Sequence, residues 1–259
     1  MCIRDRQELR EANAHLVLAK LEADALKEAA LLARARQDEF LAMLAHELRN
    51  PLAPISNAVA LLARPECSPD MLPRVRGMID RQVQHLVRLV DQLLDVSRVT
   101  QGRIVLQKAP TAVAGVVEQA LETHRGLIET RHQQLRVQLP AQALMVDGDP
   151  VRLVQVVGNL LHNAAKYTPE GGAIAVTARQ ENDVVRIEVQ DTGLGIAPEF
   201  HQRVFEKFYR IKDDNVYRIK GHGLGLYLSA YFAQLIDARI TLASQPGAGA
   251  CFALELMPA

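Results

Sequence analysis

Apolar and small residues recur every three or four positions near the start of the chain, from Leu9 to Leu44. This segment contains no glycine or proline, and Glu, Lys, Arg and Gln fill its other positions. A heptad pattern held over about five repeats predicts a coiled coil over residues 1–36, and therefore at least a dimer. A long solvated single helix is the alternative, because the many alanines make the apolar seam weak.

The helical pattern continues to about Leu62, where the segment RPECSPD ends it. A second amphipathic helix is predicted from about Pro69 to Val99. Two long helices joined by a short loop form an antiparallel hairpin, and two hairpins from a dimer form a four-helix bundle. We therefore expect residues 37–100 to form a dimerisation domain.

The pattern changes after TQGR, near residues 100–103, to short β-type runs interleaved with helical patterns near 112–130, 149–166 and 223–237. The predicted strands are RIVLQ, LRVQLP, IAVTARQ, VVRIEVQ, RITLASQ and CFALELM, with a hairpin-like ENDV between the third and the fourth. Strands mixed with helices predict an α/β sandwich over residues 103–258. The fold class of the whole chain is therefore α+β.

Composition excludes several classes of protein. Lys plus Arg and Asp plus Glu both number 30, so no strong field favours nucleic acid or an anionic membrane as a partner. No apolar run approaches the roughly 18 to 20 residues of a membrane span, and no signal peptide opens the chain. The three cysteines are scattered, which favours a reducing, cytoplasmic compartment. The opening MCIRDR enters a helix without a cap, which suggests a truncated start.

Two glycine-containing segments are candidates for nucleotide binding. In VQDTGLGIAP a strand ends at Asp191, a carboxylate suited to an exocyclic amine, and glycines follow that let the backbone approach a flat ring. An ordinary strand-ending turn is the alternative. In GHGLGLYLSAYFAQL three glycines precede a helix, so free N–H groups and the helix N-terminus suit a phosphate chain. The alternative here is a flexible loop feeding a buried helix.

A third segment, DPVRLVQVVGNLLHNAAKYTPEGG, predicts a helix capped by Asp149 and opened by Pro150. Asn159 and Asn163 lie one turn apart on the same side, and amide oxygens are suitable ligands for Mg²⁺. Lys166 follows where its ammonium could reach phosphates. A plain surface pair of asparagines is the common alternative, but the nearby lysine and the two glycine loops favour a site.

Taken in their order along the chain, these segments resemble the nucleotide-binding domain of sensor histidine kinases, within the GHKL ATPase superfamily. NLLHNAAKYTP resembles the N box, DTGLGI the G1 box, FEKFYR the F box, GHGLGL the G2 box, and HELRNPL the H box of the phosphoacceptor domain. The resemblance covers about residues 37–257. His222 is a departure, since this position of the G2 box is often Thr, and a hydroxyl contact there would be lost.

The resemblance implies a role for each matching residue. Asn163 would coordinate Mg²⁺ with Asn159 beside it, and Asp191 would bind the adenine amine. A lid over about residues 206–222 would be anchored by Phe205 and Phe208. The remaining residues implied to contact ATP are Lys166, Tyr167, Gly193, Gly195, Gly221, Gly223, Leu224 and Gly225.

Helical geometry, as well as the resemblance, indicates that His46 is a candidate nucleophile. At about 100° per residue it lies nearly opposite Leu44 and Leu48, which disfavours a core histidine. A helical zinc protease motif would need a histidine where Asn50 stands. An exposed imidazole beside a carboxylate is a competent nucleophile toward a phosphoryl group, with Glu47 as the candidate base. Asn50 could orient a water for dephosphorylation, and Pro51 could bend the helix.

The sequence thus predicts a homodimeric histidine kinase core, which uses ATP and Mg²⁺ to phosphorylate His46 and then a response-regulator receiver domain. The resemblance also implies phosphatase activity, because related kinases that dephosphorylate their partner regulator carry the same Glu-x-x-Thr/Asn spacing as Glu47 and Asn50. Two alternatives remain open: a GHKL-type ATPase that drives conformational change, and a non-catalytic dimeric scaffold. In the kinase interpretation, the N-terminal coiled coil would carry the signal from a sensor upstream of the chain, and that sensor could be membrane-bound.

Overall fold

The computed structural model describes residues 3–63, 69–101, 104–211 and 223–259, and the side chains of residues 3–14 and of several later helical positions, including His46, lie outside the description. Contacts between residues divide the chain into two units, Met1–Val83 and Gln84–Ala259. The predicted boundary near residues 100–103 stays a prediction, and residues 102 and 103 lie outside the described part.

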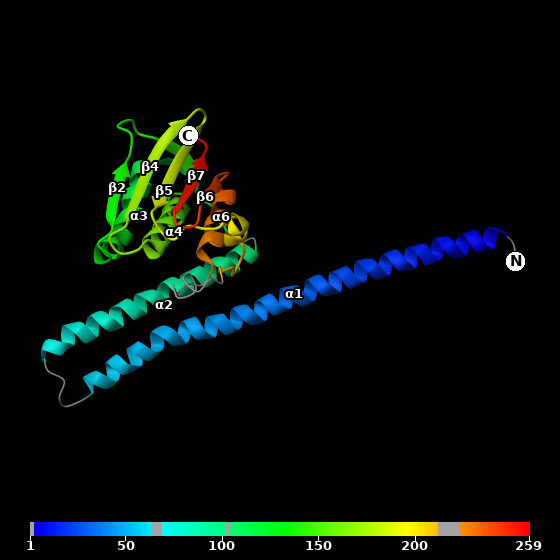
Figure 1. Cartoon of the computed structure of the whole chain (residues 1–259), viewed down its shortest axis with the longest axis horizontal. Helices are drawn as coiled ribbons and strands as arrows, with labels where there is room; N and C mark the ends of the chain where they lie inside the picture. The colour runs from blue at the N-terminus through cyan, green and yellow to red at the C-terminus, as the bar shows by residue number, and fades with distance from the viewer. Residues whose placement is uncertain (1–2, 64–68, 102–103, 212–222) are drawn as a thin grey trace. The chain divides into compact units, whose positions relative to one another are not determined.

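The first part of the chain is a helical hairpin, as predicted (Figure 1). Helix α1 (Ile3–Leu62) continues through Pro51 and Pro54, although each proline removes one helical hydrogen bond. A short 3₁₀ helix, η1 (Pro69–Met71), leads into α2 (Leu72–Thr100). In the first unit Ala58 and Val75 are buried. None of the helices in the described ranges has both the length and the hydropathy needed to cross a membrane.

The second unit is built on a mixed sheet. Among the described residues, its strands follow the order β2-β4-β5-β7-β6, with β2 parallel to β4 and the other neighbours antiparallel. A small antiparallel sheet pairs β1 with β3. The strands are β1 (Ala109–Ala112), β2 (Gln134–Gln138), β3 (Met145–Gly148), β4 (Ala173–Glu181), β5 (Val184–Asp191), β6 (Arg239–Ser244) and β7 (Ala250–Leu256).

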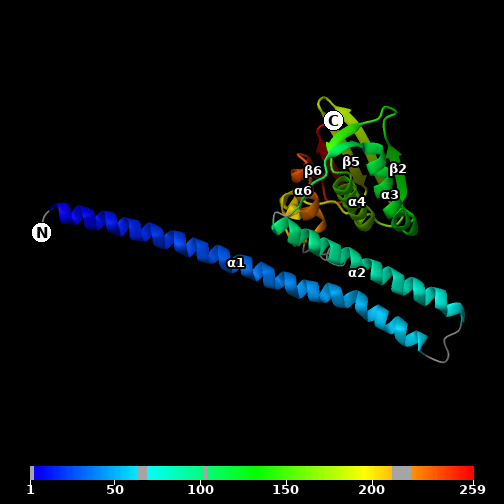
Figure 2. The ribbon, with the colours of Figure 1, turned by 180° about the vertical axis from the view of Figure 1, so that it is seen from behind.

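Three helices cover one face of the main sheet (Figures 1 and 2). They are α3 (Val113–Thr130), α4 (Pro150–Tyr167) and α6 (Gly225–Leu235). Two further 3₁₀ helices, η2 (Pro198–Phe200) and η3 (Arg203–Phe205), follow β5. The core between sheet and helices is apolar, and its fully buried side chains include Val117, Leu153, Leu160, Leu161, Ile174, Ile187, Leu224, Phe232 and Leu254.

Buried and half-buried side chains alternate along β5, so this strand contributes residues both to the core and to the outer face of the sheet. Val185, Ile187 and Val189 are buried, whereas Arg186 and Glu188 between them are half-buried on the other face. Successive side chains of a strand point to opposite faces. Asp191 continues the buried series, so its carboxylate points toward the face that the helices cover.

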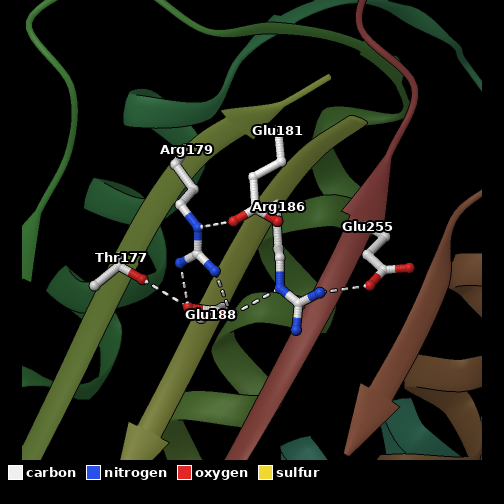
Figure 3. Close-up of polar contacts among 6 residues, drawn as sticks. All are labelled: Thr177, Arg179, Glu181, Arg186, Glu188 and Glu255. Atoms are coloured by element: carbon white, nitrogen blue, oxygen red, sulfur yellow. Dashed lines mark hydrogen bonds and ion pairs between the residues drawn. The ribbon is translucent and has the colours of Figure 1, made fainter. Parts of the chain in front are cut away.

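The outer face of the sheet carries a network of charged side chains (Figure 3). Glu188 accepts hydrogen bonds from both Arg179 and Arg186, and Arg186 also bonds Glu255 on β7. The hydrogen bonds from Arg179, ahead of those from Arg186, lower the pKa of Glu188 to about 2. These residues stabilise the exposed face, away from the helices.

One predicted strand is wrong. The described residues of RIVLQ, 104–107, form no strand; the first strand is β1, a few residues later. Val105 is 86% exposed, and the backbone N–H of Gln107 donates to Asp149 Oδ2 rather than to a neighbouring strand. The short strand β3 was not predicted. The other predicted strands and the three helices form near their expected positions.

Candidate functional site

The N-terminus of α4 is fixed as its sequence predicts. Asp149 is the N-cap, and its Oδ1 accepts hydrogen bonds from the N–H groups of Val151 and Arg152 at 3.0 and 3.2 Å. Pro150 occupies the first turn, where its missing N–H costs nothing. The predicted apolar stripe of α4 is buried. Asn159 and Asn163, one turn apart at the edge of this buried stripe, are therefore held in a fixed register.

The two asparagines of α4 differ in their surroundings. Asn159 Nδ2 donates a 2.8 Å hydrogen bond to Ser229 Oγ on α6, so this amide joins two helices. Asn163, one turn later, is half-buried. The adjacent His162 is largely buried, and burial together with the positive charge of Lys166 lowers its pKa to about 4. His162 is therefore a neutral neighbour of Asn163 near pH 7.

Lys166 and Tyr167 lie together at the end of α4. The ammonium of Lys166 donates to the hydroxyl of Tyr167 at 3.1 Å and lies 4.7 Å from the centre of its ring. Both side chains are half-buried. The ammonium remains a movable positive charge, because a single neutral hydroxyl does not neutralise it.

Asp191 is the buried carboxylate of the site, with 6% of its surface exposed. Its Oδ1 accepts hydrogen bonds from the backbone N–H groups of Gly193 at 2.8 Å and Ala250 at 3.3 Å. Within the described residues no group donates to Oδ2. Desolvation raises the pKa of Asp191, opposed by the two backbone hydrogen bonds. Hydrogen bonds to Oδ1 thus hold the carboxylate in place, and Oδ2 can accept a hydrogen bond from a ligand.

The glycines after Asp191 allow close backbone contacts. A Cβ on Gly193 would lie 2.6 Å from the carbonyl oxygen of Tyr167, so this loop packs directly against the end of α4. Gly195 has φ +69°, and a Cβ there would lie 1.9 Å from the carbonyl oxygen of Gln245. The structure therefore brings Tyr167 of the N box segment together with Asp191 and Gly193 of the G1 box segment.

Gly225, the first residue of α6, lies against α4, whereas Gly223 lies against Phe208 and Tyr209. Gly223 has φ +64°, Leu224 is buried at the N-cap, and Gly225 begins the helix. A Cβ on Gly225 would lie 2.3 Å from Asn159 Oδ1. In the described part of the chain no side chain caps this helix, so its first N–H groups can receive a ligand. Gly221 and His222 lie outside the described residues.

The F box segment is linked to these glycines. The N–H of Phe208 donates to the carbonyl of Gly223 at 3.0 Å, and Phe208 has φ +67°, an unusual value for a side chain of this size. The ring of Phe205 packs edge-on against Phe252 of β7, with 6.3 Å between centroids. The predicted lid falls mostly on residues 212–222, which lie outside the described part.

The predicted phosphoacceptor segment lies in α1, in the first unit. Glu47 is buried, with 9% of its surface exposed, and Asn50 is exposed. The side chain of His46 lies outside the description, so its predicted exposure stays a prediction.

Two contributors to the site were missed from the sequence. Ala250 donates to Asp191 and follows Gly249, whose Cβ would lie 1.9 Å from the carbonyl oxygen of Asp191. The glycine pair in PGAGA was the available signal. Ser229, the partner of Asn159, gave no signal beyond its place one turn after Gly225.

Two family models match the chain. One, described as "Histidine kinase-, DNA gyrase B-, and HSP90-like ATPase", matches residues 148–259. The other, described as "His Kinase A (phospho-acceptor) domain", matches residues 36–102. They lie in the order, and over the segments, that carry the nucleotide and histidine motifs.

The chain is also similar to individual proteins. Histidine protein kinase DivJ of Caulobacter vibrioides is 35% identical over 240 residues, which cover 92% of this chain and 39% of DivJ. The structure of full-length ShkA in complex with AMPPNP has a TM-score of 0.62 and 28% identity, covering 85% of this chain and 46% of that one.

A third likeness concerns the fold alone. The complex of histidine kinase ThkA with response regulator protein TrrA contains a chain that matches with a TM-score of 0.61 and 22% identity, covering 85% of this chain and 61% of that one. The chain spans less than two thirds of the length of each of these three proteins. The chain contains a His Kinase A phospho-acceptor domain followed by a GHKL-type ATP-binding domain, which together are the two domains of the sensor histidine kinase core.

Proposed function

We propose that this chain is the catalytic core of a two-component sensor histidine kinase, which transfers the γ-phosphoryl group of ATP to His46 and then to an aspartate of a response regulator. The observation that carries this proposal is the buried carboxylate of Asp191, held by two backbone N–H groups through one oxygen. The second oxygen of this buried carboxylate accepts no hydrogen bond from the described residues, and it suits the exocyclic amine of adenine. The His Kinase A match supplies the acceptor.

The residues around Asp191 fit the rest of ATP. Gly193 brings its loop against the end of α4, where a flat ring can meet backbone rather than side chains. The uncapped first turn of α6, after Gly223, directs N–H groups and the positive end of the helix dipole toward a phosphate chain. Lys166 offers an ammonium beside Tyr167.

Asn163 is the proposed ligand of Mg²⁺. Its side chain is a neutral oxygen ligand, half-buried on α4, and Mg²⁺ takes few protein ligands together with phosphate oxygens and water. The neighbouring His162 adds no positive charge near pH 7, because its pKa is lowered to about 4. When bound, Mg²⁺ would offset the negative charge of the phosphates.

The proposed reaction uses the residues of α1. A ring nitrogen of His46 attacks the γ-phosphorus, the bond from that phosphorus to the β–γ bridging oxygen breaks, and ADP leaves. Glu47 takes the ring proton as the new N–P bond forms. Asn50 is exposed, so it can orient a water that hydrolyses the phosphoaspartate of the response regulator to aspartate and inorganic phosphate. Pro51, which follows it within α1, is a proposed hinge.

The two domains also suggest which partners the chain binds. Exposed apolar side chains on both helices of the hairpin, including Leu52, Val59, Leu72 and Val83, suit a second copy of the chain and a four-helix bundle. ThkA was solved with a response regulator, and we propose such a receiver domain as the phosphoryl acceptor. A reducing, cytoplasmic location for this part of the protein is proposed from its scattered cysteines.

The test is incorporation of label from γ-labelled ATP with Mg²⁺ into the purified chain. We expect acid-labile, alkali-stable label, which identifies a phosphohistidine, and its loss on addition of a receiver domain. An Asn163→Ala variant should lose labelling. ATP hydrolysis without any protein-bound label would instead favour an ATPase that drives conformational change, and the absence of nucleotide binding at millimolar ATP would favour the scaffold.

A further inference from the structure

The hydrogen bond between Asn159 and Ser229 joins the two helices that carry the proposed phosphate and Mg²⁺ ligands. Asn159 Nδ2 donates to Ser229 Oγ at 2.8 Å across 70 residues of sequence. Ser229 is almost fully buried, with 2% of its surface exposed. A buried amide that loses such a partner is left unsatisfied, which costs more than the bond itself contributes. The contact is therefore well placed to fix how α4 and α6 meet.

The same carboxamide also lies against the first residue of α6. A Cβ on Gly225 would lie 2.3 Å from Asn159 Oδ1 and 3.0 Å from both Cγ and Nδ2. Gly225 and Ser229 are one turn apart, on one side of the helix. The amide of Asn159 thus rests flat along the first turn of α6, with Gly225 at one end and Ser229 at the other.

The position of this contact matters for nucleotide binding. Asn163 lies one turn along α4 from Asn159, on the same side of that helix. Gly223, with φ +64°, directly precedes the turn of α6 that Asn159 touches. A sliding of α6 against α4 at this contact would therefore change the spacing between Asn163 and the glycine loop. One Mg²⁺–phosphate group can bridge them only at a fixed spacing.

We infer that Ser229 is a positioning residue of the nucleotide site: it holds the amide of Asn159 and so keeps Asn163 and the first turn of α6, after Gly223, at the spacing that Mg²⁺ and the phosphates require. This inference rests on the proposed function, because it assumes that the site takes Mg²⁺ and a nucleoside triphosphate. Ser229 does not contact the ligand and acts only through Asn159.

The test compares binding of AMPPNP, with and without Mg²⁺, by the whole chain and its variants in calorimetry. Ser229→Ala should weaken binding in the presence of Mg²⁺ by about five- to tenfold and raise the Mg²⁺ concentration needed for half-maximal binding. Val185→Ala is the matched control, since Val185 is buried at the opposite end of the strand that ends in Asp191. It should lower Tm while keeping the affinity within about twofold of the parent.

A double variant tests whether Ser229 acts through Asn159. Adding Ser229→Ala to Asn159→Ala should cause no further loss of affinity, because the partner is already gone. An unchanged affinity and Mg²⁺ dependence in Ser229→Ala, or losses that add in the double variant, would overturn the inference while leaving the proposed function intact. No saturable binding by the parent chain would overturn the proposed function, and the inference with it.

Discussion

The backbone N–H of Gly193 donates a 2.8 Å hydrogen bond to Oδ1 of Asp191, two residues earlier in the chain. This turn commits one carboxylate oxygen to the protein and leaves the other for a ligand. We expect Asp191→Asn to keep the turn, since an amide oxygen also accepts from Gly193, but to weaken ATP binding by about tenfold or more. Calorimetric titration with ATP and Mg²⁺ measures this.

The control for this charge change is Glu199→Gln, an exposed carboxylate on η2. It should bind ATP like the parent chain. If Asp191→Asn bound ATP with the parent's affinity while remaining folded, Asp191 would not be the residue that binds the adenine amine.

Gly249 and Gly247 offer a matched pair for the backbone beside Asp191. Both have positive φ, +79° and +78°, but a Cβ at 249 would lie 1.9 Å from the carbonyl oxygen of Asp191, whereas a Cβ at 247 meets nothing within 4 Å. Gly247→Ala should therefore lower the free energy of unfolding by only about 1 to 2 kcal/mol, from the backbone conformation. Gly249→Ala should lower it by at least about 3 kcal/mol, since backbone must also move.

Urea denaturation of the two alanine variants makes this comparison. Equal destabilisation would mean that the turn before β7 does not approach Asp191 as closely as the structure has it. The position of Ala250, which donates to Asp191, would then be in question as well.

The ion pairs of Glu188 predict a dependence of stability on pH. Because the folded-state pKa is lowered from 4.5 to about 2, the stabilisation is fully present above about pH 4.5. It is lost as pH falls from there toward 2. Glu188→Gln should lower the free energy of unfolding by about 1 kcal/mol at pH 7, after screening by solvent.

The difference between Glu188→Gln and the parent should narrow as the solution is acidified through that range, as followed by denaturation at several pH values. Glu181→Gln is the control, because it removes a more exposed partner of the same Arg179. If the difference in free energy of unfolding between Glu188→Gln and the parent stayed constant from pH 7 to 3, the charge of Glu188 would contribute nothing to stability.

A buried contact attaches the end of α2 to α4 within the second unit. Asp95 accepts hydrogen bonds from Arg152 at 3.3 Å and Gln155 at 2.7 Å, and the guanidinium of Arg152 lies 4.6 Å from the ring centre of Phe232. Removing one partner leaves a buried charge unpaired, so Asp95→Asn and Arg152→Gln should each lower the free energy of unfolding by about 2 to 3 kcal/mol.

The double variant should cost about 1 to 2 kcal/mol less than the sum of the two single changes. Asp91→Asn, on an exposed position one turn earlier in α2, should have little effect. Strict additivity in the cycle would argue that Asp95 and Arg152 do not interact.

Local patterns were enough to predict those parts of the fold where the determinant lies within a few residues. Asp149 and Pro150 predicted the start of α4, because a cap and a first-turn proline act on the next three residues. The β-type run VVRIEVQ predicted β5 and its end at Asp191. Asp191 was singled out as a carboxylate at the end of an apolar strand, and the structure buries it there; its role in nucleotide binding stays a prediction.

Contacts between distant segments could not be predicted in this way. Ser229 lies 70 residues from Asn159 and Ala250 lies 59 residues from Asp191, so no local pattern records either pair. The predicted strand at RIVLQ failed for a related reason. Its composition is typical of a strand, but Gln107 bonds the cap Asp149, a partner that only the tertiary fold supplies.

The most direct test of histidine kinase activity locates the phosphoryl group. The whole chain, His46→Gln and the control His15→Gln, an exposed histidine on the same helix, are incubated with γ-labelled ATP and Mg²⁺. We expect the parent and His15→Gln to gain acid-labile label at equal rates and His46→Gln to gain none. Undiminished labelling of His46→Gln would contradict the assignment of His46 as the phosphoacceptor.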